Sequence, residues 1–302
     1  MDKVLILGGT GFVGRSLCDL LASHAGGRCR ITVPSRQPTK AKHLQALPTV
    51  HLVTADVHDA TQLAQLVEGH DAVVSLVAVL HGSEAQFRRV HVDLPRKLAN
   101  ACLAAGVRRV LHVSALGARD EGPSLYLRSK AQGEAVLRSA DLALTILRPS
   151  VIFGAEDRFM NLFARLQKFA PFVPLANAQA QFQPVWVQDV ASAIVACLDK
   201  PATAGKVFEC AGPEVFTLGE LVKLAGRWAG HERPVMPLPA SVGRLQAALM
   251  ELLPGEPLMS RDNLDSMRTP NIASGRLPSL YDLGINATPL GSVAPQYLSK
   301  GK

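Results

Sequence analysis

Tyr126 and Lys130 are the two side chains in this sequence whose types and spacing best suit proton transfer. They stand four positions apart in the stretch SLYLRSKAQGE, and on a helix that spacing places both side chains on one face. A nearby ammonium stabilises a phenolate, so we expect Lys130 to lower the pKa of Tyr126 and make it a proton donor or acceptor near neutral pH. The alternative is an exposed pair on a helix surface.

A glycine cluster near the start of the chain suits a different task, the binding of a phosphate group. The stretch VLILGGTGFVG places Gly8, Gly11 and Gly14 between an apolar run and a segment with helical periodicity. The first glycine permits a tight turn, the second lets a pyrophosphate approach the backbone, and the third lets the helix pack on the strand. Amide N–H groups at the helix start would bind the anion, so the cluster predicts a dinucleotide site.

The residues after the second apolar run indicate which dinucleotide would bind. An NAD site usually has an acidic residue about twenty positions beyond the glycines. The stretch ITVPSRQPTK has no acid there and offers Ser35, Arg36 and Lys40 instead. A guanidinium suits a 2′-phosphate, which a carboxylate would repel, so we expect NADP(H) in preference to NAD(H). Asp56, after the third run, could accept a hydrogen bond from the adenine amino group or cap a helix.

Apolar, β-branched runs alternate with segments of helical periodicity throughout the first half of the chain. The runs fall at 3–8, 30–35, 50–56, 71–79, 108–115 and 142–150, and the helical segments at 12–24, 59–69, 84–106 and 125–140. Strands that are apolar along their whole length are typical of a parallel sheet covered on both faces. We therefore predict an α/β fold, a doubly wound parallel-sheet Rossmann fold with a smaller C-terminal cap region.

The pattern becomes less regular after Pro149, and this change sets the expected division of the chain. We expect residues 1–149 and about 184–212 to form the NAD(P)-binding Rossmann domain. Residues at about 150–183 and 213–302 would form the smaller substrate or partner cap.

Composition and charge restrict the class of protein. Of the 302 residues, 48% are apolar and 19% charged, as in an ordinary globular protein. The net charge of +7 suggests an anionic partner, but only 5% of residues are aromatic and no nucleic-acid-binding motif is present, so we expect no nucleic acid. The helical stripe GRLQAALMELL, at 243–253, is expected to pack in the core or cap rather than on a membrane.

Cysteine usage and hydropathy bear on the compartment. The five cysteines are scattered, with no C-x-x-C pair, and the histidines form no metal-ligating pattern, so we expect reduced thiols and no metal site. We find no signal-peptide pattern and no apolar run long enough to span a bilayer. We therefore expect no transmembrane segment and a cytoplasmic protein, either free or peripheral at the inner face of the membrane.

Taken in order, these motifs resemble those of the extended and atypical short-chain dehydrogenase/reductases. The match comprises the glycine motif, HVSALGA, Tyr126 with Lys130, ILRPSVIFG and FQPVWVQDVASAI, and spans about residues 3–215. Within that superfamily the sequence looks most like one branch. That branch contains the nucleotide-binding accessory subunit of respiratory complex I and its free-standing bacterial relatives.

The resemblance implies a role for each matching position. Tyr126 would be the acid/base, Lys130 would orient the cofactor ribose, and Ser114 would join them as a catalytic residue. Arg36 would bind the 2′-phosphate and Asp56 the adenine. The full cofactor-binding set would be Gly8, Thr10, Gly11, Phe12, Val13, Gly14, Ser35, Arg36, Asp56, Val57, Val77, Ala78, Ser114, Tyr126, Lys130, Pro149 and Ile152.

One position departs from the family pattern. Catalytic members carry Ser or Thr two residues beyond the serine that ends the fifth strand, and this chain has Leu116 there. An aliphatic side chain cannot donate a hydrogen bond to a developing alkoxide, and losing one such donor typically costs about 10²–10³ in rate. Ser114 or Ser124 could supply the donor from another angle.

Two classes of function remain open. The first is an NADP(H)-dependent oxidoreductase, quinone- or respiratory-chain-linked, acting on a quinone, a carbonyl compound or a nucleotide sugar; in the last case it would be an epimerase or dehydratase. The second is a non-catalytic nucleotide-binding subunit with a structural, assembly or redox-sensing role and a protein partner in a respiratory complex. Leu116 favours the second class, whereas the retained Tyr126 and Lys130 favour the first.

Overall fold

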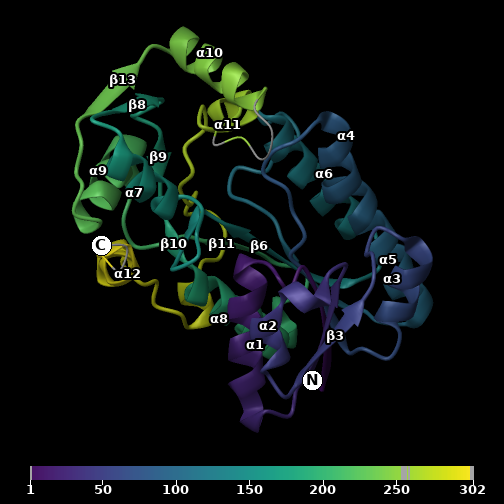
Figure 1. Cartoon of the computed structure of the whole chain (residues 1–302). Helices are drawn as coiled ribbons and strands as arrows, with labels where there is room; N and C mark the ends of the chain where they lie inside the picture. The colour runs from purple at the N-terminus through teal and green to yellow at the C-terminus, as the bar shows by residue number, and fades with distance from the viewer. Residues whose placement is uncertain (1, 253–256, 258, 300–302) are drawn as a thin grey trace.

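A parallel sheet of seven strands forms the centre of the molecule, in a computed structural model that describes residues 2–252, 257 and 259–299 (Figure 1). The strand order is β11-β6-β5-β4-β1-β2-β3, and each neighbouring pair is parallel. The strands are β1 (Lys3–Leu7), β2 (Arg30–Ser35), β3 (Val50–Thr54), β4 (Ala72–Ser75), β5 (Arg109–Val113), β6 (Ala143–Pro149) and β11 (Val207–Cys210). The chain reverses its direction of winding between β1 and β4, which confirms the predicted doubly wound Rossmann fold.

Helices cover both faces of this sheet, as its apolar strands require. In β1, Val4 and Ile6 pack into one buried cluster, while Leu5 and Leu7 pack into another on the opposite face. Burying each such side chain contributes about 1.5–3 kcal/mol. The covering helices are α1 (Phe12–Ser23) and α8 (Val187–Asp199) on the first face, and α3 (Ala60–Val67), α5 (Leu94–Ala105) and α6 (Leu125–Arg138) on the second.

Shorter elements connect these strands and helices. One of them, a π-helical turn, interrupts the helical segment expected over 84–106 and divides it into α4 and α5. The connecting elements are η1 (His24–Gly26), η2 (Pro38–Lys40), α2 (Lys42–Gln45), α4 (Glu84–Arg88), the π turn η3 (Arg89–Asp93), η4 (Pro201–Thr203) and η5 (Tyr281–Leu283).

The C-terminal part of the chain builds a separate buried cluster, which includes Phe153, Met160, Phe163 and Leu221. The elements of this part of the chain are β7 (Ile152–Phe153), α7 (Met160–Phe169), β8 (Val173–Ala176), β9 (Gln181–Phe182), β10 (Val185–Trp186), β12 (Phe216–Thr217), α9 (Leu218–Trp228), β13 (Val235–Leu238), α10 (Ala240–Glu251), α11 (Arg261–Ser266) and α12 (Leu290–Leu298). Between them the chain returns to the central sheet, where α8 packs on it and β11 pairs with β6. The domain boundaries given above stay a prediction.

Helix α10 makes the expected contact with the cap only in part, because its leucines face solvent. Val242, Leu245, Leu249 and Leu252 are 46%, 63%, 58% and 81% exposed. The helix instead packs through its small residues: Gly243 and Ala247 are buried, and a Cβ on Gly243 would overlap the side chain of Ala176 in β8. Figure 1 shows α10 at the edge of the molecule, far from the central sheet.

Within the described ranges, no helix combines the length and the apolar character that crossing a membrane requires. The same residues contain no group of three or more His, Cys, Asp or Glu side chains that could hold a metal ion. All five cysteines are free and buried, and burial raises the thiol pKa of Cys18 and of Cys102 to about 12. Thiols with such pKa values carry almost no thiolate near neutral pH.

Candidate nucleotide-binding and active site

The glycine turn has the geometry that an approaching phosphate needs. Gly8 follows β1 with φ of +86°, and a Cβ there would lie 3.2 Å from the backbone of Leu76 and Val77. A Cβ on Gly14 would overlap the carbonyl oxygen of Gly8, so the helix can lie this close to the turn only with glycine. Gly11 is the N-cap of α1, and no side chain caps the helix, which leaves its first backbone N–H groups available to an anion.

The remaining residues of the turn contact the loop after β7. The ring of Phe12 lies against Gly154, where an added Cβ would come within 3.1 Å of Phe12 Cζ. Arg15, one position beyond the last glycine of the motif, forms an ion pair with Glu156 in the same loop. The first turn of α1, which includes Val13, is therefore bordered by residues that follow β7.

The candidate residues lie at one edge of the sheet. Because parallel strands all end on the same side, the segments after β1, β2, β3, β4, β5 and β6 share that edge. Thr10 follows β1, Ser35 ends β2, Asp56 and Val57 follow β3, Val77 and Ala78 follow β4, Ser114 follows β5, and Pro149 and Ile152 mark the end of β6 and the start of β7. Their roles toward a cofactor stay predictions.

Basic side chains from three separate segments of the chain gather around His58 at this edge. Arg36 is exposed just beyond β2, Arg89 lies in η3, and Lys97 in α5 donates from Nζ to the carbonyl oxygen of His58 at 2.5 Å. Burial lowers the pKa of His58, and the charges of Arg89, Lys97 and Arg36 lower it further, partly opposed by Asp56. We call Arg36, His58, Arg89 and Lys97 the basic cluster; an anionic group would relieve their mutual repulsion.

Sequence reasoning found only part of the basic cluster. Arg36 was identified from its position after the second strand, but Arg89 and Lys97 lie more than fifty positions later in the chain. Their approach to His58 follows from the fold, since α5 packs against α3, the helix that begins just after His58. Asp56 accepts a hydrogen bond from the backbone N–H of His58 at 3.0 Å, so its carboxylate stabilises the turn after β3.

Tyr126 and Lys130 lie in α6, as predicted, but the expected effect of one on the other is wrong. Lys130 is 2% exposed, and its Nζ donates to the carbonyl oxygen of Val113 at 2.8 Å. Burial lowers the pKa of Lys130 to about 8, against the opposing charge of Glu134. Burial also raises the pKa of Tyr126 to about 12, the reverse of the expected direction, because desolvation of the phenolate outweighs any benefit from the ammonium.

Ser114 carries an unpaired hydroxyl at the carboxyl end of β5. The residue is buried, and its Oγ has no hydrogen-bond partner among the described residues. A buried hydroxyl without a partner is unfavourable by about 1–3 kcal/mol, which indicates a site completed by a ligand or water. Its neighbour Leu116 is buried and donates its backbone N–H to the Pro149 carbonyl at 2.9 Å.

Ser124, the alternative donor considered above, serves as a helix cap. It is buried as the N-cap of α6, where its Oγ accepts a hydrogen bond from the backbone N–H of Leu127 at 3.1 Å. The same oxygen accepts a second bond from the Ser266 hydroxyl in α11, at 2.8 Å. Ser124 therefore stabilises the start of the helix, whereas the Ser114 hydroxyl has no partner among the described residues and is the candidate we consider further.

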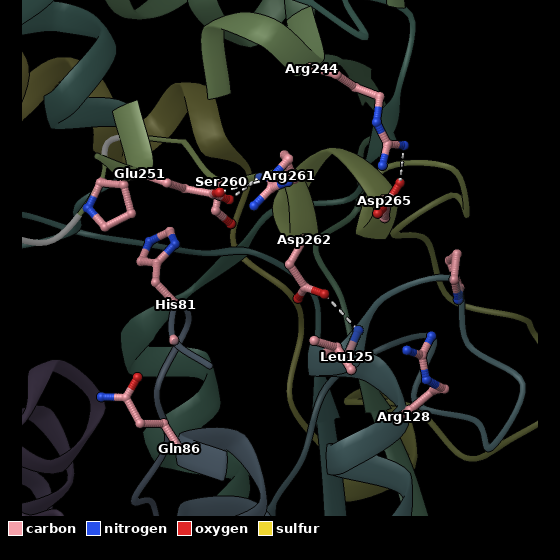
Figure 2. Close-up of a pocket in the computed structure, with 13 residues that line it drawn as sticks. His81, Gln86, Leu125, Arg128, Arg244, Glu251, Ser260, Arg261, Asp262 and Asp265 are labelled. Carbon is pink, nitrogen blue, oxygen red and sulfur yellow. Dashed lines mark hydrogen bonds and ion pairs between the residues drawn. The ribbon is translucent and has the colours of Figure 1, made fainter. Parts of the chain in front are cut away.

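A cavity of about 610 Å³ lies between the loop after β4, the start of α6, and helices α10 and α11 (Figure 2). Its lining residues are His81, Gly82, Gln86, Pro123, Leu125, Arg128, Arg244, Glu251, Pro257, Ser260, Arg261, Asp262 and Asp265. Ion pairs join Arg244 to Asp265 at 2.9 Å and Arg261 to Glu251 at 2.8 Å. The cavity reaches Leu125, which directly precedes Tyr126, but Tyr126 itself is not among the residues that line it.

Comparisons with known proteins agree with this geometry. Residues 8–201 match the NAD(P)H-binding family. The chain is 34% identical to "NADH dehydrogenase [ubiquinone] 1 alpha subcomplex subunit 9, mitochondrial" of Mus musculus over 292 residues, covering 94% of this chain and 76% of that protein. It is also 31% identical to "Ceramide reductase" of Caulobacter vibrioides over 240 residues, covering 78% and 73% of the two chains.

Solved structures agree at the level of the fold. UDP-glucuronic acid 4-epimerase from Bacillus cereus, in complex with UDP-glucuronic acid and NAD, superposes with a TM-score of 0.70 at 16% identity, covering 99% of this chain and 100% of that one. At this identity the likeness concerns the fold alone. The sequence matches go further: the chain belongs to the NAD(P)H-binding family, within the extended short-chain dehydrogenase/reductases, and is homologous to subunit 9 of the mitochondrial NADH dehydrogenase 1 alpha subcomplex.

Proposed function

We propose that this NAD(P)-binding domain takes NADP(H) in preference to NAD(H). The diphosphate would lie on the uncapped first turn of α1, where Gly8 and Gly14 leave room for it. The 2′-phosphate would lie at the basic cluster, where Arg36 is joined by Arg89 and Lys97. Affinity for reduced and oxidised forms of both nucleotides, measured by calorimetry, tests the proposal; absence of binding to any of them would overturn it.

We further propose that the protein is an oxidoreductase whose substrate enters the cavity beside α6. When bound, the nicotinamide would supply or accept a hydride. Tyr126 would exchange a proton with the substrate oxygen, and Lys130 would hold the cofactor ribose. The observation that carries this proposal is the unpaired, buried hydroxyl of Ser114, which could donate to that oxygen in place of the residue replaced by Leu116.

Single-turnover spectroscopy tests this activity. The protein is loaded with NADPH, and quinones, ketones and nucleotide sugars are added one at a time while the reduced-nicotinamide absorbance is followed. We expect oxidation by one class, and its loss in both Tyr126→Phe and Ser114→Ala. Tight NADPH binding without oxidation by any compound would favour the second candidate below.

The second candidate is a nucleotide-binding subunit with a structural, assembly or redox-sensing role beside a respiratory complex. Two observations favour it: Leu116 occupies the usual donor position, and α10 exposes an apolar face. Val242, Leu245, Leu249 and Leu252 follow the 3-4-3 spacing of a helix–helix seam, and neither charged residue of α10 lies in that seam. We propose that this seam binds an apolar helix of another protein subunit.

Charge substitution in the seam tests this candidate. In Leu245→Glu with Leu249→Glu, we expect co-purification with NADH:quinone oxidoreductase activity from the membrane fraction of the source cells to be lost, while NADPH affinity is unchanged. Tyr281→Glu, at a side chain that is equally accessible but lies in η5, is the matched control. Flotation with protein-free vesicles separates binding to lipid from binding to a subunit. If the double variant still co-purifies with NADH:quinone oxidoreductase activity, the seam of α10 is not the contact with the complex.

A further inference from the structure

His91 lies at the junction between the loop after β4 and the helix that carries Tyr126. It sits in η3, the π-helical turn between α4 and α5, and it is buried. Single π-helical turns occur often at functional sites. None of the roles proposed above involves this imidazole, yet both of its ring nitrogens are bonded to elements of the candidate site.

A chain of three hydrogen bonds passes through the imidazole. The backbone N–H of Val79, directly after Ala78, donates to Nε2 of His91 at 3.1 Å. On the other side of the ring, Nδ1 lies 2.8 Å from the hydroxyl oxygen of Ser129 in α6. Ser129 in turn donates its hydroxyl to the carbonyl oxygen of Tyr126 at 2.9 Å.

The two ends of this chain determine the tautomer of His91 independently. A backbone N–H can only donate, so Nε2 must accept and carries no proton. The Ser129 hydroxyl donates its one hydrogen to the Tyr126 carbonyl, so its oxygen accepts from Nδ1–H of His91. Both requirements give the same neutral imidazole, protonated at Nδ1 only.

Packing around the imidazole leaves it little freedom. The ring centroid of His91 lies 5.6 Å from that of Phe87 and 5.6 Å from that of Tyr126, which meets it edge-on. On the backbone side, a Cβ on Gly133 would overlap the carbonyl oxygen of His91, so α6 approaches η3 as closely as glycine allows. The ring therefore holds one orientation between the loop and the helix.

We infer that His91 is a positioning residue that fixes the loop at 76–80 against α6, through Val79 on one side and Ser129 on the other. This inference rests on the proposed function, in which Ala78 borders the nicotinamide ribose and Tyr126 faces the substrate. The effect would be to set the distance between the cofactor loop and the acid/base before either ligand binds.

The electrostatic surroundings keep the imidazole in the required neutral state. Burial, together with the nearby ammonium of Lys130, lowers the pKa of His91 to about 3. The imidazole therefore stays neutral at physiological pH, and the Val79 N–H keeps its acceptor.

Three substitutions of His91 separate its bond with the Val79 N–H from its bond with the Ser129 hydroxyl. The side-chain amide of Gln can reach the place of Nε2, so His91→Gln retains an acceptor for Val79. The amide of Asn reaches only the place of Nδ1, so His91→Asn keeps the contact with Ser129 and leaves the Val79 N–H unpaired. His91→Phe keeps the aromatic packing and loses both bonds. His70→Asn is the control, because that imidazole bonds to Thr32 in β2 instead.

Hydrogen exchange at the Val79 amide and NADPH affinity are measured on all five proteins. We expect Val79 exchange to speed up about tenfold or more in His91→Asn and His91→Phe, as for the loss of one buried hydrogen bond, and to change little in His91→Gln and His70→Asn. NADPH affinity should fall in the same two variants and be rescued in His91→Gln. In the wild type, nitrogen-15 NMR should find the proton on Nδ1.

A proton on Nε2 of His91, or unchanged Val79 exchange in His91→Asn, would overturn the inference. So would faster Val79 exchange, which reports loss of the bond to Nε2, without any loss of NADPH affinity. Circular dichroism on each variant confirms that the fold is retained. Failure of the proposed function is distinguishable: a wild type that binds no nucleotide would remove the cofactor role, while the exchange and tautomer results would still report on the bridge.

Discussion

Asp262 joins the C-terminal part of the chain to the helix that carries Tyr126, and its removal is a direct test of how that helix is held. Its carboxylate accepts a backbone N–H bond from Leu125 at 2.6 Å (Figure 2) and a second one from Tyr126 at 3.1 Å. These amides are among those at a helix start that have no partner within the helix. A negative charge there also interacts favourably with the helix dipole. We predict that Asp262→Asn destabilises the protein.

The expected size follows from these contacts. Asn keeps the shape of Asp262 but loses its charge, and an NH₂ group that cannot accept replaces one of the two oxygens, which here accept separately from Leu125 and Tyr126. Loss of a capping interaction costs about 0.5–2 kcal/mol, and loss of the charge at a helix start about 0.3–1 kcal/mol. Asp262 is half-buried, so we expect a combined loss of about 2 kcal/mol in the free energy of unfolding. At about 2 °C per kcal/mol for a chain of this length, Tm should fall by about 4 °C.

Thermal unfolding of two variants measures this effect against a matched background. Asp265→Asn changes the same residue type on the same helix, but Asp265 pairs with Arg244, whose side chain is mostly exposed. We expect that ion pair to contribute less than about 1 kcal/mol, and Tm to fall by no more than about 2 °C. Equal shifts in the two variants, or no shift in Asp262→Asn, would refute the reasoning that Asp262 caps α6.

Three further predictions concern the nucleotide and the catalytic groups. In Arg36→Asp, we expect Kd for NADPH to rise about ten- to a hundredfold and Kd for NADH to change little, by calorimetry; an equal loss of both would mean that the 2′-phosphate lies elsewhere. In Leu116→Thr, we expect the single-turnover rate to change by less than about tenfold, because Ser114 already donates to the substrate oxygen; a rise of about 10² would mean that Ser114 does not supply this donor. The pKa of Lys130 falls from 10.5 to about 8, so the unfolded state binds this proton more tightly, and the resulting penalty of roughly 3 kcal/mol acts below pH 8 and fades toward pH 10.5. Denaturant titrations should therefore find the stability gain of Lys130→Met over the wild type largest at pH 7 and smaller at pH 10. A gain that does not change with pH would refute the lowered pKa of Lys130.

The central fold could be predicted from the sequence because its signals are local. Val4 to Leu7 are apolar without interruption, and only a strand buried on both faces uses every position in this way. Gly8 and Gly14 mark the turn because each fills a place where a Cβ would be strained or would overlap the backbone. Neither signal depends on what lies far along the chain.

Features that depend on contacts between distant segments could not be predicted. The stripe of α10 has the same periodicity whether its leucines face the core or solvent, and the choice rests on Gly243 fitting against Ala176 in β8. Arg89 and His91 are adjacent to ordinary helical positions in the sequence, and only the fold places them beside His58 and Val79. The pKa of Tyr126 depends on how deeply the side chain is buried, and its spacing to Lys130 in the sequence gives no information about burial.

The raised pKa of Tyr126 keeps this side chain a proton donor in the proposed reaction. At a pKa of about 12, the tyrosine is protonated near neutral pH, so in this state it can donate a proton and has little capacity to accept one. Lys130, with a pKa of about 8, is charged below that pH and can stabilise negative charge that develops on the tyrosine oxygen as the proton leaves. A donor of this kind suits reduction of a carbonyl or quinone, in which a hydride arrives at the substrate and its oxygen needs a proton. In the proposed reduction by NADPH, the protonated Tyr126 therefore supplies the proton that the substrate oxygen needs.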